Sequence, residues 1–383
     1  MSRLEELIQR YCPDGVEYKA LKEVLKIKNG RDYKHLGSGS IPVYGSGGIM
    51  TYVDTSMYDK PSVLIPRKGS IDKLYYVDTP FWNVDTVFYT EINTSLVKEK
   101  YVFYVLQKEH LEKLNTAGGV PSLTQAVLNE VVIPVPPMPV QEEIVRILDS
   151  FTELQAELQA ELQKRKQQYN YYRDNLLSFS GRPDVKICEL GEIGTFIRGN
   201  GLQKKDFTKS GVGCIHYGQI YTRFGAFADK TLTYVDENLA SRLLQVEKGN
   251  LVIACTSENV EDICKCVAWL GDETICTGGH ACVFRHRQNP KYISYFFQTE
   301  FFYNQKVKYT YGTKVKDIKP DSLAKIQIPL PSLQEQERIV SILDNLYTLT
   351  NDLTTGLPAE IEKRQQQYEY YRDRLLTFKR KGA

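Results

Sequence analysis

Short apolar runs separated by polar breaks dominate the first third of the chain. Residues 1–139 contain runs of β-branched and aromatic residues bounded by Gly, Pro and Asp, a pattern typical of β-strands. One helix is predicted within residues 98–115, where apolar residues recur at helical spacing. The predicted strands include residues 62–65, 74–77 and 86–89.

The second half of the chain follows the same order of elements. The apolar run at 250–254 matches the run at 62–65, and a helix predicted at 292–307 matches the helix of the first half. We therefore expect two globular domains, residues 1–139 and residues 181–331, that share a plan and differ in detail.

Prolines lie at the end of the first predicted domain. They occupy positions 134, 136, 137 and 139, and Ile328–Pro331 repeats the first part of this segment as Ile-Pro-Leu-Pro. Because proline removes a backbone donor and fixes φ, we expect this segment to exclude regular structure and to mark a domain boundary.

Each predicted domain is followed by a polar segment in which apolar residues step by threes and fours. These segments are residues 140–180 and residues 332–379. Their narrow apolar stripes favour a coiled-coil seam over a broad core face. In the second segment, Gly356 and Pro358 should interrupt the helix, with Pro358 restarting it at a first-turn position. That segment opens with a capping-box pattern formed by Ser332 and Glu335.

The two helical segments are copies of one another. KRKQQYNYYRDNLLSF at 164–179 returns as KRQQQYEYYRDRLLTF at 363–378, with twelve of the sixteen positions identical. An I-V-x-I-L-D stretch occurs at both 144–149 and 339–344. A repeat of this length predicts two copies of one unit, each ending in a helix. The first segment also contains the tandem units ELQA, ELQA and ELQ at 153–163.

We expect the two helical segments to pair in antiparallel fashion. The first would span roughly 58 Å at about 1.5 Å per residue, whereas a domain of about 150 residues is under about 40 Å across and could not bridge a parallel pair. The expected fold class is α+β, with two similar strand-rich domains separated by an antiparallel two-helix coiled coil and related by a pseudo-twofold axis. The alternative is that each helix packs on its own domain.

Composition narrows the class of protein. The chain has 383 residues, of which 42% are apolar and 25% charged, as is ordinary for a soluble protein of two or three domains. We expect a cytoplasmic protein without a membrane partner, because neither a long apolar run nor a secretory signal is present. Its eight cysteines lack framework spacing, which favours reduced thiols. Since the net charge is only +2, binding to nucleic acid would require basic residues sorted to one face.

The complete pattern resembles the DNA-specificity subunit of type I restriction-modification systems. The resemblance rests on two divergent domains, each followed by IPVPP or IPLP, an I-V-x-I-L-D stretch and a KRxQQYxYYRDxLLxF helix, and it covers essentially the whole chain. It implies that each domain is a target recognition domain that reads half of a bipartite, asymmetric site in double-stranded DNA. It also implies that the helices separate the two domains and dock two methyltransferase subunits, which restriction subunits then join.

The same resemblance implies that the chemistry lies elsewhere. This chain would be a non-catalytic subunit of an endonuclease and adenine-N6 methyltransferase complex. It would hold no cofactor itself, and S-adenosylmethionine, ATP and Mg would belong to the partner subunits.

No catalytic motif is evident in the residues themselves. A GxxxxGK[ST] phosphate loop is absent, and the nearest match to a methyltransferase Asn-Pro-Pro-aromatic motif, at 135–138, lacks the amide and the aromatic residue. The group Cys264, Cys266, Cys276, His280 and Cys282 could hold zinc but has no CxxC pair, so we predict no metal site. A stand-alone DNA-modifying enzyme and a protein-only scaffold are the alternative functions.

Loops that differ between the two domains are the candidate DNA readers. Base edges are read by side chains on loops or strands that enter a groove, while cationic side chains and backbone amides contact phosphates. For each candidate, an ordinary surface-loop role is the alternative. The candidates are Tyr44, Ser46, Arg67, Lys68, Ser70, Gly119 and Ser122 in the first domain, and His216, Tyr217, Gln219, Ser257, Asn259, Tyr311, Thr313 and Lys314 in the second.

Two further groups of residues are singled out. Lys306, Lys308, Lys314 and Lys316 are predicted to face phosphates, with a solvated charged face as the alternative. The repeated helices are predicted to form the coiled coil or to anchor partner subunits through Tyr169, Tyr172, Arg173, Leu176, Tyr368, Tyr371, Arg372 and Leu375.

Overall fold

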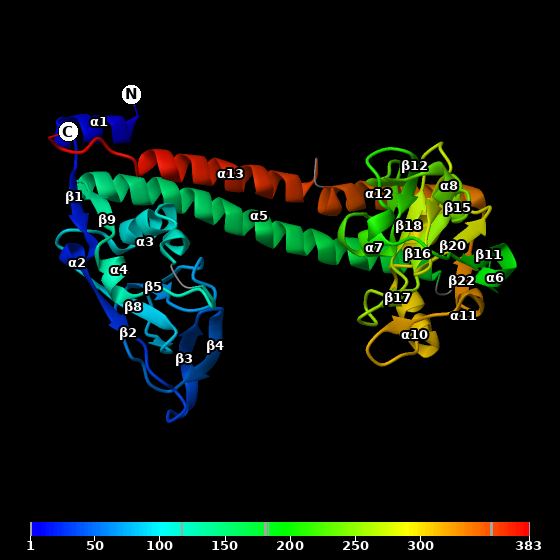
Figure 1. The fold of residues 1–383 in the computed structure, drawn as a ribbon, viewed down its shortest axis with the longest axis horizontal. Helices are drawn as coiled ribbons and strands as arrows, with labels where there is room; N and C mark the ends of the chain where they lie inside the picture. The colour runs from blue at the N-terminus through cyan, green and yellow to red at the C-terminus, as the bar shows by residue number, and fades with distance from the viewer. Residues whose placement is uncertain (1, 116–117, 180–181, 183, 353–354, 383) are drawn as a thin grey trace. The chain divides into compact units, whose positions relative to one another are not determined.

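The computed structural model describes residues 2–115, 118–179, 182, 184–352 and 355–382, and it divides into two compact units (Figure 1). The first unit contains Met1–Leu158 and Ile361–Ala383, and the second contains Gln159–Glu360. Each unit therefore combines a globular domain with two stretches of long helix that are distant in sequence.

The first unit is built on a four-stranded antiparallel sheet in the order β2-β8-β5-β6. Its β5 is buried along its whole length, because strands flank it on both sides and α3 packs against it. A second sheet, β4-β3-β7, contains the β3–β4 hairpin. The strands are β2 Leu25–Asn29, β3 Ser38–Gly45, β4 Gly48–Val53, β5 Ser62–Pro66, β6 Tyr75–Val77, β7 Trp82–Asn83 and β8 Val87–Ile92. The strands predicted at 62–65, 74–77 and 86–89 are thereby confirmed.

The predicted exclusion of regular structure holds at Pro136 and Pro137 but is wrong at Pro134 and Pro139. Pro134 lies within β9 (Val132–Val135), opposite Tyr18 of β1 (Glu17–Ala20) in an antiparallel pair. Two-stranded ribbons have free edges, which tolerate a residue without an N–H. Pro139 lies in the first turn of α5 (Met138–Ser178), where the missing donor costs no hydrogen bond.

Helices cover the first sheet and close the unit. The helix predicted within 98–115 is α3, Glu99–Lys108, followed by a short 3-10 turn, η1, at Leu111–Leu114. An additional helix, α1, was not predicted, although Ser2 and Glu5 form a capping box at its start. The chain ends beside this region, because Val16 N–H donates to Lys379 O at 2.9 Å. The remaining bounds are α1 Arg3–Tyr11, α2 Leu21–Val24 and α4 Gln125–Asn129.

The second unit repeats the sheet and enlarges it. Five strands follow the order β11-β20-β16-β18-β13, with fully buried β16 at the centre, and four more follow the order β14-β12-β19-β15. The strands are β10 Lys186–Glu189, β11 Gly194–Arg198, β12 Val212–Ile215, β13 Phe227–Ala228, β14 Thr233–Val235, β15 Leu244–Val246, β16 Leu251–Ala254, β17 Thr256–Ser257, β18 Cys266–Trp269, β19 Ile275–Thr277, β20 Ala281–His286, β21 Lys316–Asp317 and β22 Gln327–Leu330.

The single helix predicted at 292–307 is wrong, because two helices occupy this region. α9 (Pro290–Phe296) ends at its cap Phe297, and α10 (Glu300–Tyr309) restarts at Thr299, whose hydroxyl accepts from Phe302 N–H at 3.2 Å. A threonine that caps a new helix offers the backbone an alternative to continuing the old one. The other helices are α6 Leu190–Ile193, η2 Lys204–Asp206, α7 Tyr217–Thr222, α8 Glu237–Ala240 and α11 Pro320–Ala324.

The long helices agree with the sequence prediction. α5 is continuous, and the second helical segment is divided into α12 (Leu333–Asn351) and α13 (Leu357–Leu375), with Pro358 in the first turn of α13. In the first unit, α5 and α13 are antiparallel, since Phe151 stacks on Tyr371 and Gln155 bonds Gln365 (Figure 1). In the second unit, the later part of α5 contacts α12, as Tyr169 meets Tyr347 at 5.9 Å.

The aspartate of each I-V-x-I-L-D stretch attaches its helix to a globular domain. In the first unit, Asp149 of α5 accepts from Tyr104 Oη at 2.6 Å and from Lys100 Nζ at 2.9 Å, both on α3. The second unit repeats the arrangement with Asp344 of α12 and with Tyr295 and Lys291 of α9, at 2.6 Å each.

Candidate nucleic-acid interface

In the first unit, the three loops predicted to read DNA lie together. Lys68 forms a β-bridge with Ser122, and Gly69 N–H donates to Pro121 O at 3.2 Å. A Cβ placed on Gly69 would lie 3.4 Å from Ser46 Oγ, so the hairpin turn borders the same surface. The hairpin of β3 and β4 also exposes apolar side chains, among them Ile49, Met50 and Tyr52.

The remaining candidates of the first unit contribute in different ways. Tyr44 is half-buried and packs against Tyr75 and Phe81, so it attaches the hairpin to the hydrophobic cluster around Phe81. Ser70 is half-buried, and Gly119 is exposed, with no atom near the place that a Cβ would take. Ser122 N–H is held by Asn115 Oδ1 at 3.0 Å.

In the second unit, the equivalent loops also lie together. Ser257 of β17 pairs with Lys316 of β21, which repeats the pairing of Lys68 with Ser122 at the same exit from the central strand. Tyr217 lies against His280, whose Nδ1 is 3.1 Å from Thr256 Oγ1. α7, with its cap His216, borders this surface, as the β3–β4 hairpin borders the surface of the first unit.

Several candidates of the second unit use their side chains internally. His216 is buried and its Nδ1 accepts from Gly218 N–H, while Gln219 accepts from His216 N–H and contacts Thr233 Oγ1. Burial and the nearby Lys204 and His280 charges lower the pKa of His216, which favours the neutral ring. Asn259, Tyr311, Thr313 and Lys314 are exposed, although the side chain of Asn259 bonds Asp262 and that of Tyr311 bonds Asp317.

The loop that presents Tyr311 is held by residues the sequence analysis missed. Arg198 of β11 donates two hydrogen bonds to Asp317, at 2.8 and 2.7 Å, and Tyr311 Oη donates a third at 3.1 Å. Burial alone would raise the pKa of Asp317, but the hydrogen bonds and charge of Arg198 outweigh it and the pKa is lowered. No local signal marks this pair, because 119 residues separate its members.

The four lysines predicted to face phosphates do not behave alike. Lys306 is buried, and its ammonium donates to the carbonyls of Glu261 and Ile263, so the prediction is wrong for this residue. Burial also lowers the pKa of Lys306. Lys308 and Lys314 are exposed, and Lys316 donates to Gly312 O at 2.8 Å.

The repeated tyrosine and arginine of the helices dock on the globular domains. Tyr169 Oη bonds Gln298 in the second unit at 3.0 Å, and Tyr368 Oη bonds Gln107 in the first at 2.7 Å. Arg173 and Arg372 each lie over the tyrosine four residues earlier, Tyr169 or Tyr368, and pair with the aspartate that follows them. Tyr169 and Tyr368 belong to the two main hydrophobic cores, so the long helices are integral parts of the domains.

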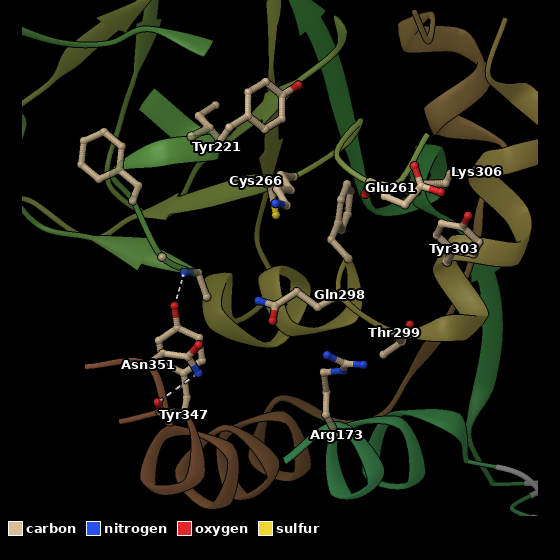
Figure 2. Close-up of a pocket in the computed structure, with 16 residues that line it drawn as sticks. Arg173, Tyr221, Glu261, Cys266, Gln298, Thr299, Tyr303, Lys306, Tyr347 and Asn351 are labelled. Atoms are coloured by element: carbon tan, nitrogen blue, oxygen red, sulfur yellow. Dashed lines mark hydrogen bonds between the residues drawn. The ribbon is translucent and has the colours of Figure 1, made fainter. Parts of the chain in front are cut away.

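A pocket of 370 Å³ lies beside Arg173 in the second unit (Figure 2). Gln298 and Thr299 line the pocket, as does Tyr347, whose hydroxyl oxygen accepts from Ala226 N–H at 2.8 Å. The first unit has a hollow of 290 Å³ beside Arg372. Three cations of the larger pocket, Arg173, Lys265 and Lys306, already have protein partners, so we assign it no ligand.

The other predicted helix residues divide between core and surface. Leu176 and Leu375 pack against the cores of the second and first units. Tyr371 stacks on Phe151, whereas the side chain of Tyr172 is 42% exposed. The adjacent Tyr171 and Tyr370 are more exposed still, at 67% and 60%.

The chemistry-bearing residues form no metal centre in the part of the chain that the structure describes, where no group of three or more His, Cys, Asp or Glu residues could hold an ion. All eight cysteines are buried and free, as expected for reduced thiols. Among the described helices, none is both long and apolar enough to cross a membrane.

Known proteins are similar to this chain in both sequence and fold. The family profile of the type I restriction modification DNA specificity domain matches residues 13–165 and 183–363. A Haemophilus influenzae protein assigned as a type I restriction enzyme specificity subunit is 31% identical over 98% of both chains. A type I restriction enzyme specificity subunit of Escherichia coli is 35% identical over 73% of this chain and 70% of its own length.

Comparison with solved structures shows that the fold is also similar. The S subunit of a type I restriction-modification system from M. genitalium covers 94% of this chain and 96% of its own, with a TM-score of 0.57 at 14% identity. A structure from a study of complex assembly in a type I system covers 95% of this chain and 98% of its own, with a TM-score of 0.56 at 15% identity. The predicted fold class is confirmed, and the chain belongs to the type I restriction-modification DNA specificity family.

Proposed function

We propose that this chain is the DNA-recognition subunit of a type I restriction-modification complex. The observation that carries the proposal is that two related scaffolds present different surfaces at equivalent places. The exit of the central strand is paired with a neighbouring loop in both units, but a β-hairpin borders it in the first unit and α7 borders it in the second. Different readers on related scaffolds suit a bipartite, asymmetric site in double-stranded DNA.

Docking of partner subunits is the second part of the proposal. Tyr171 and Tyr370 occupy the same place in the two helical repeats, and both expose most of their rings. Exposed aromatic side chains are enriched where proteins bind one another. Two equivalent positions suit two methyltransferase subunits, to which restriction subunits are added.

Catalysis belongs to those partners in this proposal. The chain acts in the cytoplasm as a non-catalytic subunit, while S-adenosylmethionine, ATP and Mg are bound by the other subunits. The match to the DNA specificity domain family and the relatives assigned as specificity subunits support this division.

Methylome sequencing tests DNA recognition directly. Long-read sequencing of host cells with and without this gene should show one bipartite methylated motif that depends on the gene. Unchanged methylation in the presence of intact methyltransferase subunits would contradict the proposal.

A co-purification experiment tests the docking surface. Replacing both Tyr171 and Tyr370 with Ala should weaken capture of the methyltransferase subunits by at least about tenfold, since loss of a central aromatic contact costs about 2 kcal/mol or more. Tyr11→Ala is the matched control, because Tyr11 is 41% exposed on α1, outside the repeats. Equal capture by the double variant and the control would exclude this surface.

A further inference from the structure

The backbone of Arg67 is fixed at the centre of the first unit's candidate surface. Its N–H donates to Thr86 O at 2.9 Å, and its carbonyl accepts from Leu123 N–H at 2.9 Å. Arg67 directly follows the buried strand β5, and its N–H and its carbonyl are both hydrogen-bonded to neighbouring segments. The position of its Cα is therefore set by the fold.

The side chain of Arg67 is also oriented. Its guanidinium carbon lies 5.1 Å from the centre of the Phe88 ring, and Phe88 is almost completely buried. Stacking of a planar guanidinium on an aromatic face restricts its rotation. The fork of donors is thus presented in a limited range of directions.

The hydrogen-bonding capacity of this guanidinium is largely unused. Its one hydrogen bond within the described residues goes from Nη1 to Asn29 Oδ1, at a long 3.4 Å, and Nε is buried without a partner. No carboxylate of the described chain lies within ion-pair distance of it. The arginines that act structurally are different, since Arg198 forms an ion pair with Asp317 and Arg173 forms one with Asp174.

The surroundings of Arg67 favour a base edge over a phosphate. Thr86, which binds the Arg67 backbone, borders a hollow of 890 Å³ that runs to the hairpin turn. Asp32 and Asp85 line the same hollow beside one cation, Lys34, so its charged lining is negative on balance and would repel a phosphate placed within it. A neutral base edge meets no such repulsion.

We propose that Arg67 reads a guanine in the first half-site, with its guanidinium donating to O6 and N7 in the major groove. This pairing matches the fork of donors to two adjacent acceptors that only guanine presents. Asn29 acts as a positioning residue that holds the fork before DNA arrives. The inference rests on the proposed function and specifies one base contact of that function.

The test uses the assembled complex with its methyltransferase subunits. Affinity for duplexes containing the methylated motif is measured for the wild-type chain, Arg67→Gln and Arg67→Lys. Arg10→Gln is the matched control, because Arg10 lies on α1 of the same unit and away from this surface. Thermal unfolding of each variant verifies that the fold is retained.

We expect Arg67→Gln to weaken binding by about tenfold to a hundredfold, the range for loss of one bidentate base contact. The methylated motif should become degenerate at one guanine of the first half-site, with the second half-site unchanged. Arg67→Lys should lose the same discrimination while keeping the salt dependence, because lysine retains the charge and lacks the fork.

A modified base separates a guanine contact from a phosphate contact. Replacing that guanine with 7-deazaguanine removes N7, so it should weaken wild-type binding and have little further effect on Arg67→Gln. Uniform weakening on all sequences, with a salt slope reduced by about one, would instead identify a phosphate contact and overturn the inference. A first half-site without a G·C pair, or unaltered binding by Arg67→Gln, would overturn it as well. Failure of the wild-type complex to bind any such duplex would refute the proposed function itself.

Discussion

One additional ELQA unit inserted after Ala160 should lengthen the unspecified spacer of the DNA target by one or two base pairs. α5 is helical without interruption from Met138 to Ser178. Four residues at about 1.5 Å each add about 6 Å to it. Base pairs rise by about 3.4 Å, so the insertion corresponds to slightly less than two of them.

The structure explains why the contacts of α5 should survive the insertion. The boundary between the two units crosses α5 between Leu158 and Gln159, close to the insertion point. The contacts of Phe151 lie in the first unit and those of Tyr169 lie in the second, so each set keeps its register. Four residues also rotate the helix by only about 40°.

The returning chain must lengthen too, and this sets the design of the assay. A second variant combines the ELQA insertion with four residues added after Gly356, between α12 and α13. An insertion of three residues is the matched control, because it rotates the helix by about 60° in the opposite sense and should impair activity. Long-read methylome sequencing reports the motif of each strain. An unchanged spacer in both four-residue variants, or altered half-sites, would refute the reasoning.

Three further predictions concern the separate units. Exchange of residues 1–139 for those of another family member should change one half of the methylated motif in long-read sequencing, and a change in both halves would contradict the division. Asp149→Ala and Asp344→Ala should each lower the free energy of unfolding by about 2–3 kcal/mol, since each leaves a buried tyrosine and a lysine without their acceptor, and urea titrations should show additive losses. Burial lowers the pKa of His286 from 6.5 to about 4, so the unfolded state binds a proton that the folded state excludes, and stability is lost as the pH falls below about 6.5. Urea unfolding should show that His286 lowers the free energy of unfolding by about 2 kcal/mol between pH 7 and pH 5. In His286→Asn, the amide oxygen can still accept from Gln288 N–H, and this pH-dependent loss should disappear. An identical acid dependence in the variant would contradict the role given to His286.

The elements were predictable where local pattern and tertiary environment agree. The apolar run at 62–65 became the central strand β5, and the break at Gly356 divided α12 from α13. The prediction failed at Pro134 because a free ribbon edge accepts proline, and at 292–307 because Thr299 starts a new helix. At Pro134 the pairing with a strand distant in sequence decided the structure, whereas at Thr299 a local helix cap ended the apolar pattern.

The candidate surface was predictable as a set of loops and unpredictable in its details. The loops around Ser46, Gly69 and Pro121 do lie together, although Ser46 follows a strand of one sheet and Gly69 follows a strand of the other. The burial of Lys306 was missed because a charged side chain can be accommodated inside when carbonyls accept from it. That condition depends on residues brought together only by folding.

The sequence by itself determined that the protein consists of two copies of one unit and that each copy includes a long helix. A sixteen-residue repeat with twelve identities cannot arise from local propensity, so it specifies duplication whatever the tertiary arrangement. It also determined that the loops of the two copies differ, which is what two readers require.

Only the tertiary structure decided how the repeats are distributed between the units. The first unit combines the I-V-x-I-L-D stretch of α5 with the tyrosine repeat of α13, and the second combines the stretch of α12 with the tyrosine repeat of α5. The two tyrosine repeats are so alike that either could, by its residues alone, dock on either domain. The choice follows from the continuity of α5, whose two ends belong to different units.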